Sequence, residues 1–160
     1  MRLLQTFRFD ATDELVFERA AASGEWAVPG TFAFAQDSEA TLVGKRLQAF
    51  RSGFLGLESF GWSTFAIVAS IEADLFERLV ARLAEHFVAC YGAPDIEAAL
   101  PVARQELEFA SSLCDHPIHT VIAVERELTE EGIRERFRRI RRPEDPLHAR
   151  IWEVVPEEEA

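Results

Sequence analysis

Two cysteines and two of the four histidines are the side chains of this sequence best suited to hold a metal ion. His86 and Cys90 are four residues apart, about one turn of a helix. Cys114 and His116 lie close together in a later segment. If two antiparallel helices brought these pairs together, the four side chains could bind zinc tetrahedrally. Their spacing matches no common zinc module, and a free cysteine also suits the apolar face of a helix. We therefore predict no cofactor and keep the metal site as the alternative.

Between Gly53 and Phe65, three glycines lie among four aromatic residues and one carboxylate. Glycine lets the backbone turn sharply or approach another group closely, and aromatic rings bury a large area. The glycine spacing is not that of a phosphate-binding or dinucleotide-binding loop. We therefore favour a structured corner that leads into a central strand. A binding surface is the alternative, and its candidate residues are Phe54, Glu58, Phe60 and Trp62.

Arginines are concentrated near the end of the chain, in the stretch from Arg134 to Arg142. Guanidinium groups bind carboxylates and phosphates in a bidentate way, so this stretch could recognise an acidic partner. We predict that it forms a helix over residues 130–141, with Thr129 as the cap. Acidic residues flank the stretch, and pairing with them on a solvated helix is the simpler interpretation. The candidate binding residues are Arg134, Arg138, Arg139 and Arg142.

No arrangement of residues in the sequence points to catalysis. There is no local Ser-His-Asp or Cys-His set, and the carboxylates are too numerous to single out a pair. The net charge of −11 argues against binding to nucleic acid. We therefore expect a protein that is not an enzyme.

Composition indicates a soluble globular domain. The chain has 160 residues, of which 48% are hydrophobic, and these proportions suit one packed core. Its longest apolar runs are too short to cross a bilayer, and the N-terminus lacks the apolar region of a signal peptide. We expect a cytoplasmic protein with no membrane association.

In the first half of the chain, apolar stretches separated by turn residues predict strands. Leu3, Phe7 and Phe9 alternate with polar residues, which is the period of a strand with one buried face. Pro29-Gly30 is a turn signal, since proline fixes one dihedral and glycine tolerates a positive φ. We predict strands at residues 2–9, 14–18, 26–28 and 31–35 in an antiparallel meander, a helix at 38–50 and a central strand at 62–69.

Two long amphipathic helices are predicted in the second half of the chain. Apolar residues recur with helical spacing over residues 72–91, and Gly92 follows that helix. Asp95 is a suitable N-cap for a helix over 96–114, in which Pro101 would introduce a kink. Strands are predicted at 120–124 and 149–155.

The order of these elements favours the α+β class. We predict a single domain over residues 1–155, with an antiparallel-rich sheet packed against the two long helices. Residues 156–160, which include three glutamates, are predicted to form an acidic tail.

Two segments of the sequence, at residues 54–61 and 128–137, resemble those of an uncharacterised family of short acidic bacterial proteins, a domain of unknown function. The resemblance covers nearly the whole chain and carries over no catalytic or binding residue. Similar families lie beside redox or molybdenum enzyme systems, which implies an accessory role.

We therefore expect a non-catalytic binding or accessory protein that recognises another protein, possible partners including a redox-enzyme system. Its binding surface would combine residues 53–65, here called the Gly/aromatic segment, with the arginine-rich helix predicted at 130–141. A small enzyme or ligand-binding protein, with a pocket near Glu58, Phe60, Trp62 and His116, is the alternative. Because an aromatic patch also suits a dimer interface, a homodimer is a third alternative.

Overall fold

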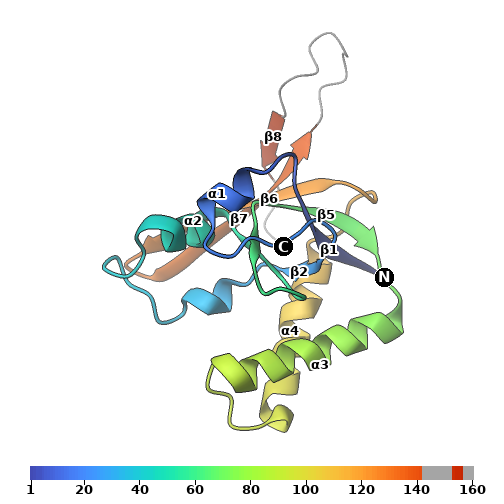
Figure 1. The fold of residues 1–160 in the computed structure, drawn as a ribbon. Helices are drawn as coiled ribbons and strands as arrows, with labels where there is room; N and C mark the ends of the chain where they lie inside the picture. Colours follow the sequence, from blue (N-terminus) through green and yellow to red (C-terminus); the bar gives the residue numbers. More distant parts are fainter. Residues whose placement is uncertain (142–152, 157–160) are drawn as a thin grey trace.

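The computed structural model of the protein describes residues 1–141 and 153–156. Within these residues, eight strands form one sheet in the order β4-β3-β2-β1-β5-β6-β7-β8, and every neighbouring pair is antiparallel. Figure 1 shows the sheet with the helices around it. The antiparallel sheet predicted from the sequence is therefore confirmed. The strands are β1 (Arg2–Phe7), β2 (Trp26–Val28), β3 (Phe54–Gly56), β4 (Trp62–Ser63), β5 (Phe65–Ser70), β6 (Val121–Thr129), β7 (Gly132–Arg141) and β8 (Glu153–Pro156).

Strands β1 and β5 form the centre of the sheet. They pair along their whole length, and the directly opposed Leu4 and Val68 are both fully buried. Alternate side chains of a strand point to the same face, so this pair contributes to one continuous apolar layer. β5 also pairs with β6 on its other side. The central strand predicted at 62–69 is therefore right for residues 65–69, which lie in β5, and wrong for Trp62 and Ser63, which form the edge strand β4.

The helices contribute the remaining apolar side chains of the core. They are α1 (Thr12–Val16), the 3-10 turn η1 (Thr31–Phe34), α2 (Gly44–Ser52), α3 (Ala73–Cys90) and α4 (Ile96–Ser112). α4 packs on β1 and β2, and α3 packs mainly on α4 (Figure 1). The Asp95 side chain accepts a hydrogen bond from the N–H of Ala98 at 2.8 Å, as a capping residue should. The prediction of two long helices is met in part: α3 and α4 form where expected, and α4 has the more extensive contact with the sheet.

The predicted arginine-rich helix is wrong. Residues 132–141 form strand β7, which pairs with β6 from Val121↔Ile140 to Thr129↔Gly132. The Glu130-Glu131 pair, which suggested the first turn of a helix, instead forms the turn of this hairpin. Gly132 follows the turn with a φ of 120°, a value that residues with a side chain rarely adopt. Pairing with a distant strand has overridden the local helix signal.

The N-terminal meander is predicted only in part. β1 and β2 are strands, but residues 12–16 form the helix α1 and residues 31–34 form the turn η1. α2 begins at Gly44 rather than at residue 38. The hydroxyl of Thr41 donates to Asp37 at 2.7 Å and accepts from the N–H of Ser38 at 2.9 Å. Such local bonds compete with helix formation, so residues 38–41 form a turn before the helix.

The described part of the chain forms one α+β domain with two apolar clusters. The larger one lies between the sheet and the helices α3 and α4. The smaller one lies under α2 and contains Phe17, Phe34 and Phe50. None of the helices in the described residues is sufficiently long and apolar to span a membrane. The acidic tail was predicted at 156–160, but Pro156 is the last residue of β8. The rest of that tail, 157–160, and the start of the last predicted strand, 149–152, lie outside the described residues.

Candidate functional site

A buried carboxylate organises the Gly/aromatic segment. Glu25, just before β2, is only 4% exposed. Its Oε1 accepts hydrogen bonds from the N–H groups of Glu58 at 3.1 Å and Ser59 at 2.7 Å. Its Oε2 accepts from the N–H of Ala22 at 2.9 Å, and the Ser59 hydroxyl contacts both oxygens. Glu25 therefore fixes the turn between β3 and β4 against the segment that precedes β2.

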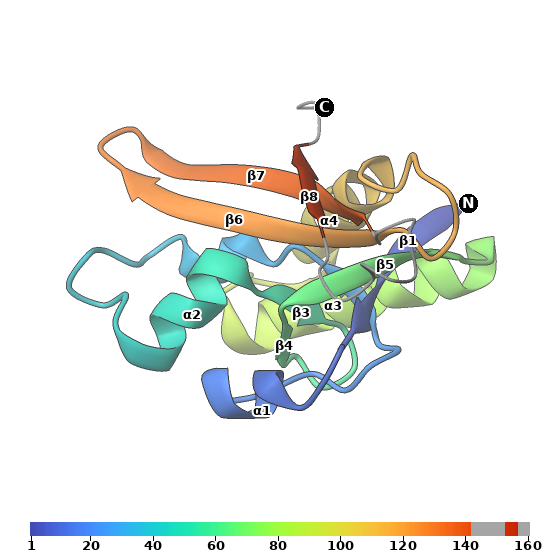
Figure 2. The same cartoon turned by 90° about the horizontal axis from the view of Figure 1, so that it is seen from above.

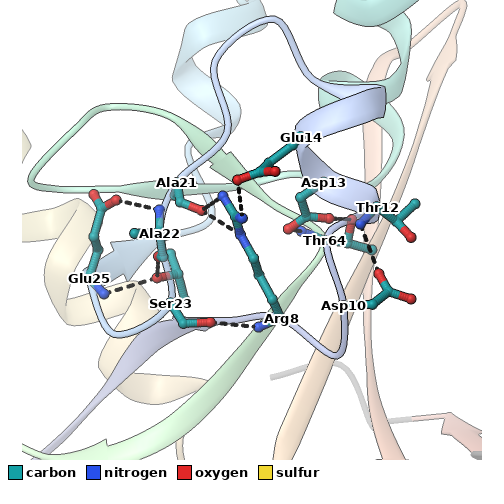
Figure 3. Close-up of polar contacts among 11 residues, drawn as sticks. Arg8, Asp10, Thr12, Asp13, Glu14, Ala21, Ala22, Ser23, Glu25 and Thr64 are labelled. Carbon is teal, nitrogen blue, oxygen red and sulfur yellow. Dashed lines mark hydrogen bonds and ion pairs between the residues drawn. The ribbon is translucent and has the colours of Figure 1, made fainter.

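That preceding segment is held by Arg8 (Figure 3). The Nε and Nη2 groups of Arg8 donate to the carbonyl of Ala21 at 2.9 and 2.6 Å, and Nη1 donates to Glu14 at 3.0 Å. Beside it, the buried Asp13 accepts hydrogen bonds from the N–H and hydroxyl of Thr64 at 3.2 and 2.6 Å. These bonds connect α1, the segment before β2 and the start of β5 into one rigid support.

Close approaches of neighbouring groups explain the glycines of this segment. A Cβ at Gly56 would lie 2.5 Å from Oε1 of Glu25. A Cβ at Gly61 would lie 2.8 Å from the backbone of Ala20 and Ala21. These contacts are shorter than real Cβ atoms make, so a larger residue would displace the carboxylate or the backbone. The predicted structural role of the glycines, a tight corner, is therefore met at these two positions and at Gly53, where a Cβ would lie 2.7 Å from the Ala49 carbonyl oxygen.

Phe60, at the end of this turn, has a left-handed backbone. Its φ is 54°, which is uncommon for a bulky residue and therefore strained. Hydrogen bonds on both sides hold it: the N–H of Gly61 donates to the Ser59 hydroxyl at 3.0 Å, and the N–H of Gly56 donates to the Gly61 carbonyl at 2.9 Å. The phenyl ring is half-buried and stacks on the imidazole of His86 in α3. The ring centroids are 3.7 Å apart and the planes differ by 4°.

Two arginines surround this stack. Arg82, one turn before His86 on α3, donates to the carbonyls of Leu57 at 2.5 Å and Glu58 at 2.7 Å. Its guanidinium carbon lies 5.0 Å from the centroid of the Phe60 ring, within the range of a cation–π contact. Arg19 donates to the carbonyl of Ser59 at 3.4 Å. We call the region formed by Arg19, Glu58, Phe60, Arg82 and His86 the Phe60 surface.

The charges of the Phe60 surface act on its histidine. Burial lowers the pKa of His86, and the positive charges of Arg82 and Arg19 lower it further. His86 is therefore a neutral, flat ring near pH 7. The cationic character of this surface comes from the two arginines, within a chain whose net charge is −11.

The four candidates from the Gly/aromatic segment divide between the core and the surface. Phe54 is fully buried, and its ring centroid lies 6.3 Å from that of Phe137 on β7. Trp62 is half-buried and packs on Phe34 with centroids 5.1 Å apart. Glu58 is exposed and Phe60 is half-buried. A small-molecule pocket near these residues remains a prediction.

The arginine candidates lie on both faces of β7. Arg134 pairs with Glu127 at 3.0 Å, and Arg138 pairs with Glu125 at 3.1 Å, so these two follow the predicted pairing with nearby acids. Arg139 is on the opposite face of the strand, because side chains alternate. Arg142 lies outside the described residues.

The arginine with the most extensive contacts, Arg126, was not among the candidates. Its side chain is fully buried, and its Nε forms an ion pair with Glu135 at 2.9 Å. Nη1 donates to the carbonyls of Phe50 at 3.0 Å and Gly53 at 2.9 Å, and Nη2 donates to that of Pro29 at 2.6 Å. Arg126 therefore fixes the end of α2 and the start of β3 on the hairpin.

The metal alternative gains no support from the positions of its residues. Cys114 is buried, which raises the pKa of its thiol to about 12, whereas Cys90 is exposed at the end of α3. His86 is stacked on Phe60. In the part of the chain that the structure describes, no three metal-ligating side chains form a group that could hold an ion.

Sequence reasoning missed Glu25, Arg19, Arg82 and Arg126. The spacing of Arg82 and His86 on one face of a helix was a signal that could have been used. Glu25 and Arg126 carry no local signal, because most of the groups that they bind come from distant parts of the chain. These are Glu58 and Ser59 for Glu25, and Pro29, Phe50 and Gly53 for Arg126.

Fold and site together define an α+β protein with a hydrogen-bonded turn that carries aromatic and cationic side chains. The chain belongs to the family described as "Family of unknown function (DUF6505)", whose model matches residues 1–153. The predicted resemblance to a family of unknown function is thus confirmed. No curated protein and no solved structure matches the chain.

Proposed function

We propose that this protein is a non-catalytic accessory protein that recognises another protein through the Phe60 surface. The observation that carries the proposal is the strained, left-handed backbone of Phe60, which holds a half-buried ring in one fixed position. Strain of this kind concentrates at functional sites, where the surroundings enforce it. A surface that is already ordered loses little entropy on binding, which favours affinity.

The chemistry of the Phe60 surface indicates what it would bind. Within the described residues, hydrogen bonds occupy the Nε and Nη2 groups of Arg82, and Nη1 is left to face a partner. Arginine prefers carboxylates, and the stacked rings of Phe60 and His86 offer a flat apolar area beside it. We infer that the partner inserts an acidic side chain next to an apolar one. A partner from a redox-enzyme system and a homodimer both remain predictions.

Site-specific cross-linking tests this proposal. A photoreactive amino acid replaces the exposed Glu58, and the matched control carries it at the exposed Arg78, which is four residues before Arg82 on the same helix. In cells that express each variant, we expect a protein cross-linked from position 58 and not from position 78. Equal products from both positions, or none, would contradict the proposal.

A quantitative measurement with the purified cross-linked protein completes the test. Phe60→Ala should weaken binding by about tenfold or more, which is the effect of removing an aromatic anchor. Arg78→Glu, which changes the charge of the same helix, should leave the affinity unchanged. Circular dichroism establishes that each variant is folded. An affinity that does not depend on Phe60 would show that the surface lies elsewhere.

A further inference from the structure

The outer edge of β7 is half unpaired in the described residues. β6 pairs with β7 from Gly132 to Ile140, whereas β8 pairs only with Arg138–Arg141. No other described strand lies beside residues 132–137, where β7 forms the margin of the sheet (Figure 2). In an antiparallel pair, alternate residues turn their backbone N–H and C=O groups to the same side. Because the hairpin closes with the pair Thr129↔Gly132, the backbone groups of Ile133, Glu135 and Phe137 point away from β6.

The two faces beside this edge differ in chemistry. Arg134 and Arg136 are exposed on one face. On the other face, the ring of Phe137 contacts that of Phe109 on α4, with centroids 5.8 Å apart. Val102 is seven residues before Phe109 and therefore lies on the same side of α4. Phe109 and Val102 are 38% and 49% exposed, so apolar surface continues next to the edge.

A second copy of the chain does not suit this edge. If two β7 edges paired in antiparallel fashion about Glu135, Arg134 of one copy would lie opposite Arg136 of the other. Like charges in directly opposed positions destabilise a strand pair. The edge charges thus repel a second copy and favour a strand with the opposite charge.

We propose that the edge from Ile133 to Phe137 binds an extended segment of another protein by strand addition, and that this segment alternates acidic with apolar residues. Its backbone would bond to the three outward-facing residues, as in other cases where a peptide adds a strand to a sheet. Its acidic side chains contact Arg134 and Arg136, and its apolar side chains contact Phe109 and Val102. The ion pair of Arg134 with Glu127 is exposed on both sides, so its exchange for a partner carboxylate costs little. This inference uses none of the residues of the Phe60 surface.

Fluorescence anisotropy with the full chain tests the proposal. The probe is a short labelled peptide of alternating glutamate and valine, and the comparison peptide has lysine in place of glutamate. We expect the acidic peptide to bind and the basic one not to. The double variant Arg134→Glu with Arg136→Glu should bind the acidic peptide at least about tenfold more weakly, since it reverses both charges. The control, Arg51→Glu with Arg78→Glu, makes the same charge change at exposed positions elsewhere and should bind normally.

The backbone contribution is measured with the acidic peptide methylated on alternate backbone nitrogens, which prevents strand pairing on one side. Methylation on the side that faces β7 should abolish binding. If the methylated or basic peptide binds as well as the acidic one, or if none binds, the proposal is wrong. The proposal is also wrong if a variant truncated after Pro156 binds the acidic peptide and the full chain does not. In that case the acidic residues 157–159 of the chain itself would occupy the edge.

Discussion

The imidazole of His86 stacks on the phenyl ring of Phe60 with their centroids 3.7 Å apart. His86 comes from α3 and Phe60 from the turn between β3 and β4, so one ring pair joins a helix to the strained turn. The stack depends on a titratable ring whose pKa is lowered by burial and by Arg82 and Arg19. The turn is therefore coupled to the protonation of this histidine.

The free energy of unfolding should decrease as the pH falls below about 6.5, the ordinary pKa of histidine. The folded state holds the pKa of His86 below that value, so the unfolded chain takes up the proton first. Unfolding is then favoured progressively until the pH is also below the folded pKa, while above 6.5 the full stability is present. Urea denaturation at a series of pH values measures this dependence.

The matched control for this pH dependence is His86→Phe, which keeps an aromatic ring and removes the titration. The difference between the two stability curves should be constant above pH 6.5 and should change below it. If the two curves run parallel through the acidic range, His86 does not control the turn.

Arg126→Met should lower the stability by about 3 kcal/mol or more, because it removes one partner of a buried ion pair and leaves buried carbonyls without donors. The carbonyls concerned belong to Pro29, Phe50 and Gly53. Arg134→Met is the control, since Arg134 pairs with Glu127 on the same hairpin but is exposed. Its cost should be within about 1 kcal/mol. Equal losses in thermal or urea unfolding would contradict this account of Arg126.

Glu25→Gln should loosen the turn that presents Phe60. The carboxylate accepts hydrogen bonds from Ala22, Glu58 and Ser59, and an amide would direct its own N–H₂ group at some of these donors. We expect a loss of about 1–3 kcal/mol and faster hydrogen exchange at the amides of Glu58 and Ser59. Exchange rates in α3 serve as the internal control, and unchanged rates in the turn would rule out this role of Glu25.

Only one thiol should react in the folded protein. Burial raises the pKa of Cys114 to about 12, so it is neither ionised nor accessible at pH 8, whereas Cys90 is exposed. A thiol reagent should therefore modify one cysteine rapidly and the second only after denaturation. Cys90→Ser should remove the rapid phase. Rapid reaction of the Cys90→Ser variant would show that Cys114 is accessible.

Local patterns in the sequence predicted the helices α3 and α4 within about two residues at each end. Apolar residues at helical spacing, Gly92 after α3 and the capping Asp95 all act over a few residues, so they can be recognised without a partner. The central strand β5 was also predicted, because a short run that is apolar on every residue is typical of a strand buried on both faces.

The arginine-rich segment shows where this local reasoning fails. Residues 130–141 contain good helix-forming residues and two glutamates suited to a first turn, and the spacing of four between Ile133 and Phe137 fits one face of a helix as well as of a strand. The choice depends on β6, which offers a paired strand along the whole length. Helix propensity of a few tenths of a kcal/mol per residue does not outweigh such pairing.

The sequence by itself determined the α+β class, the two long helices and most of the central strand β5. It also indicated acidic partners for Arg134 and Arg138, although it placed these arginines on a helix. Only the tertiary structure decided that Phe54 belongs to the core, that Phe60 stacks on His86, and that Glu25 and Arg126 are buried. The physical reason is the distance along the sequence over which each interaction acts. Periodicity and capping report the environment of neighbouring residues, whereas burial of a charge requires donors or acceptors that separate segments bring together only when the chain has folded.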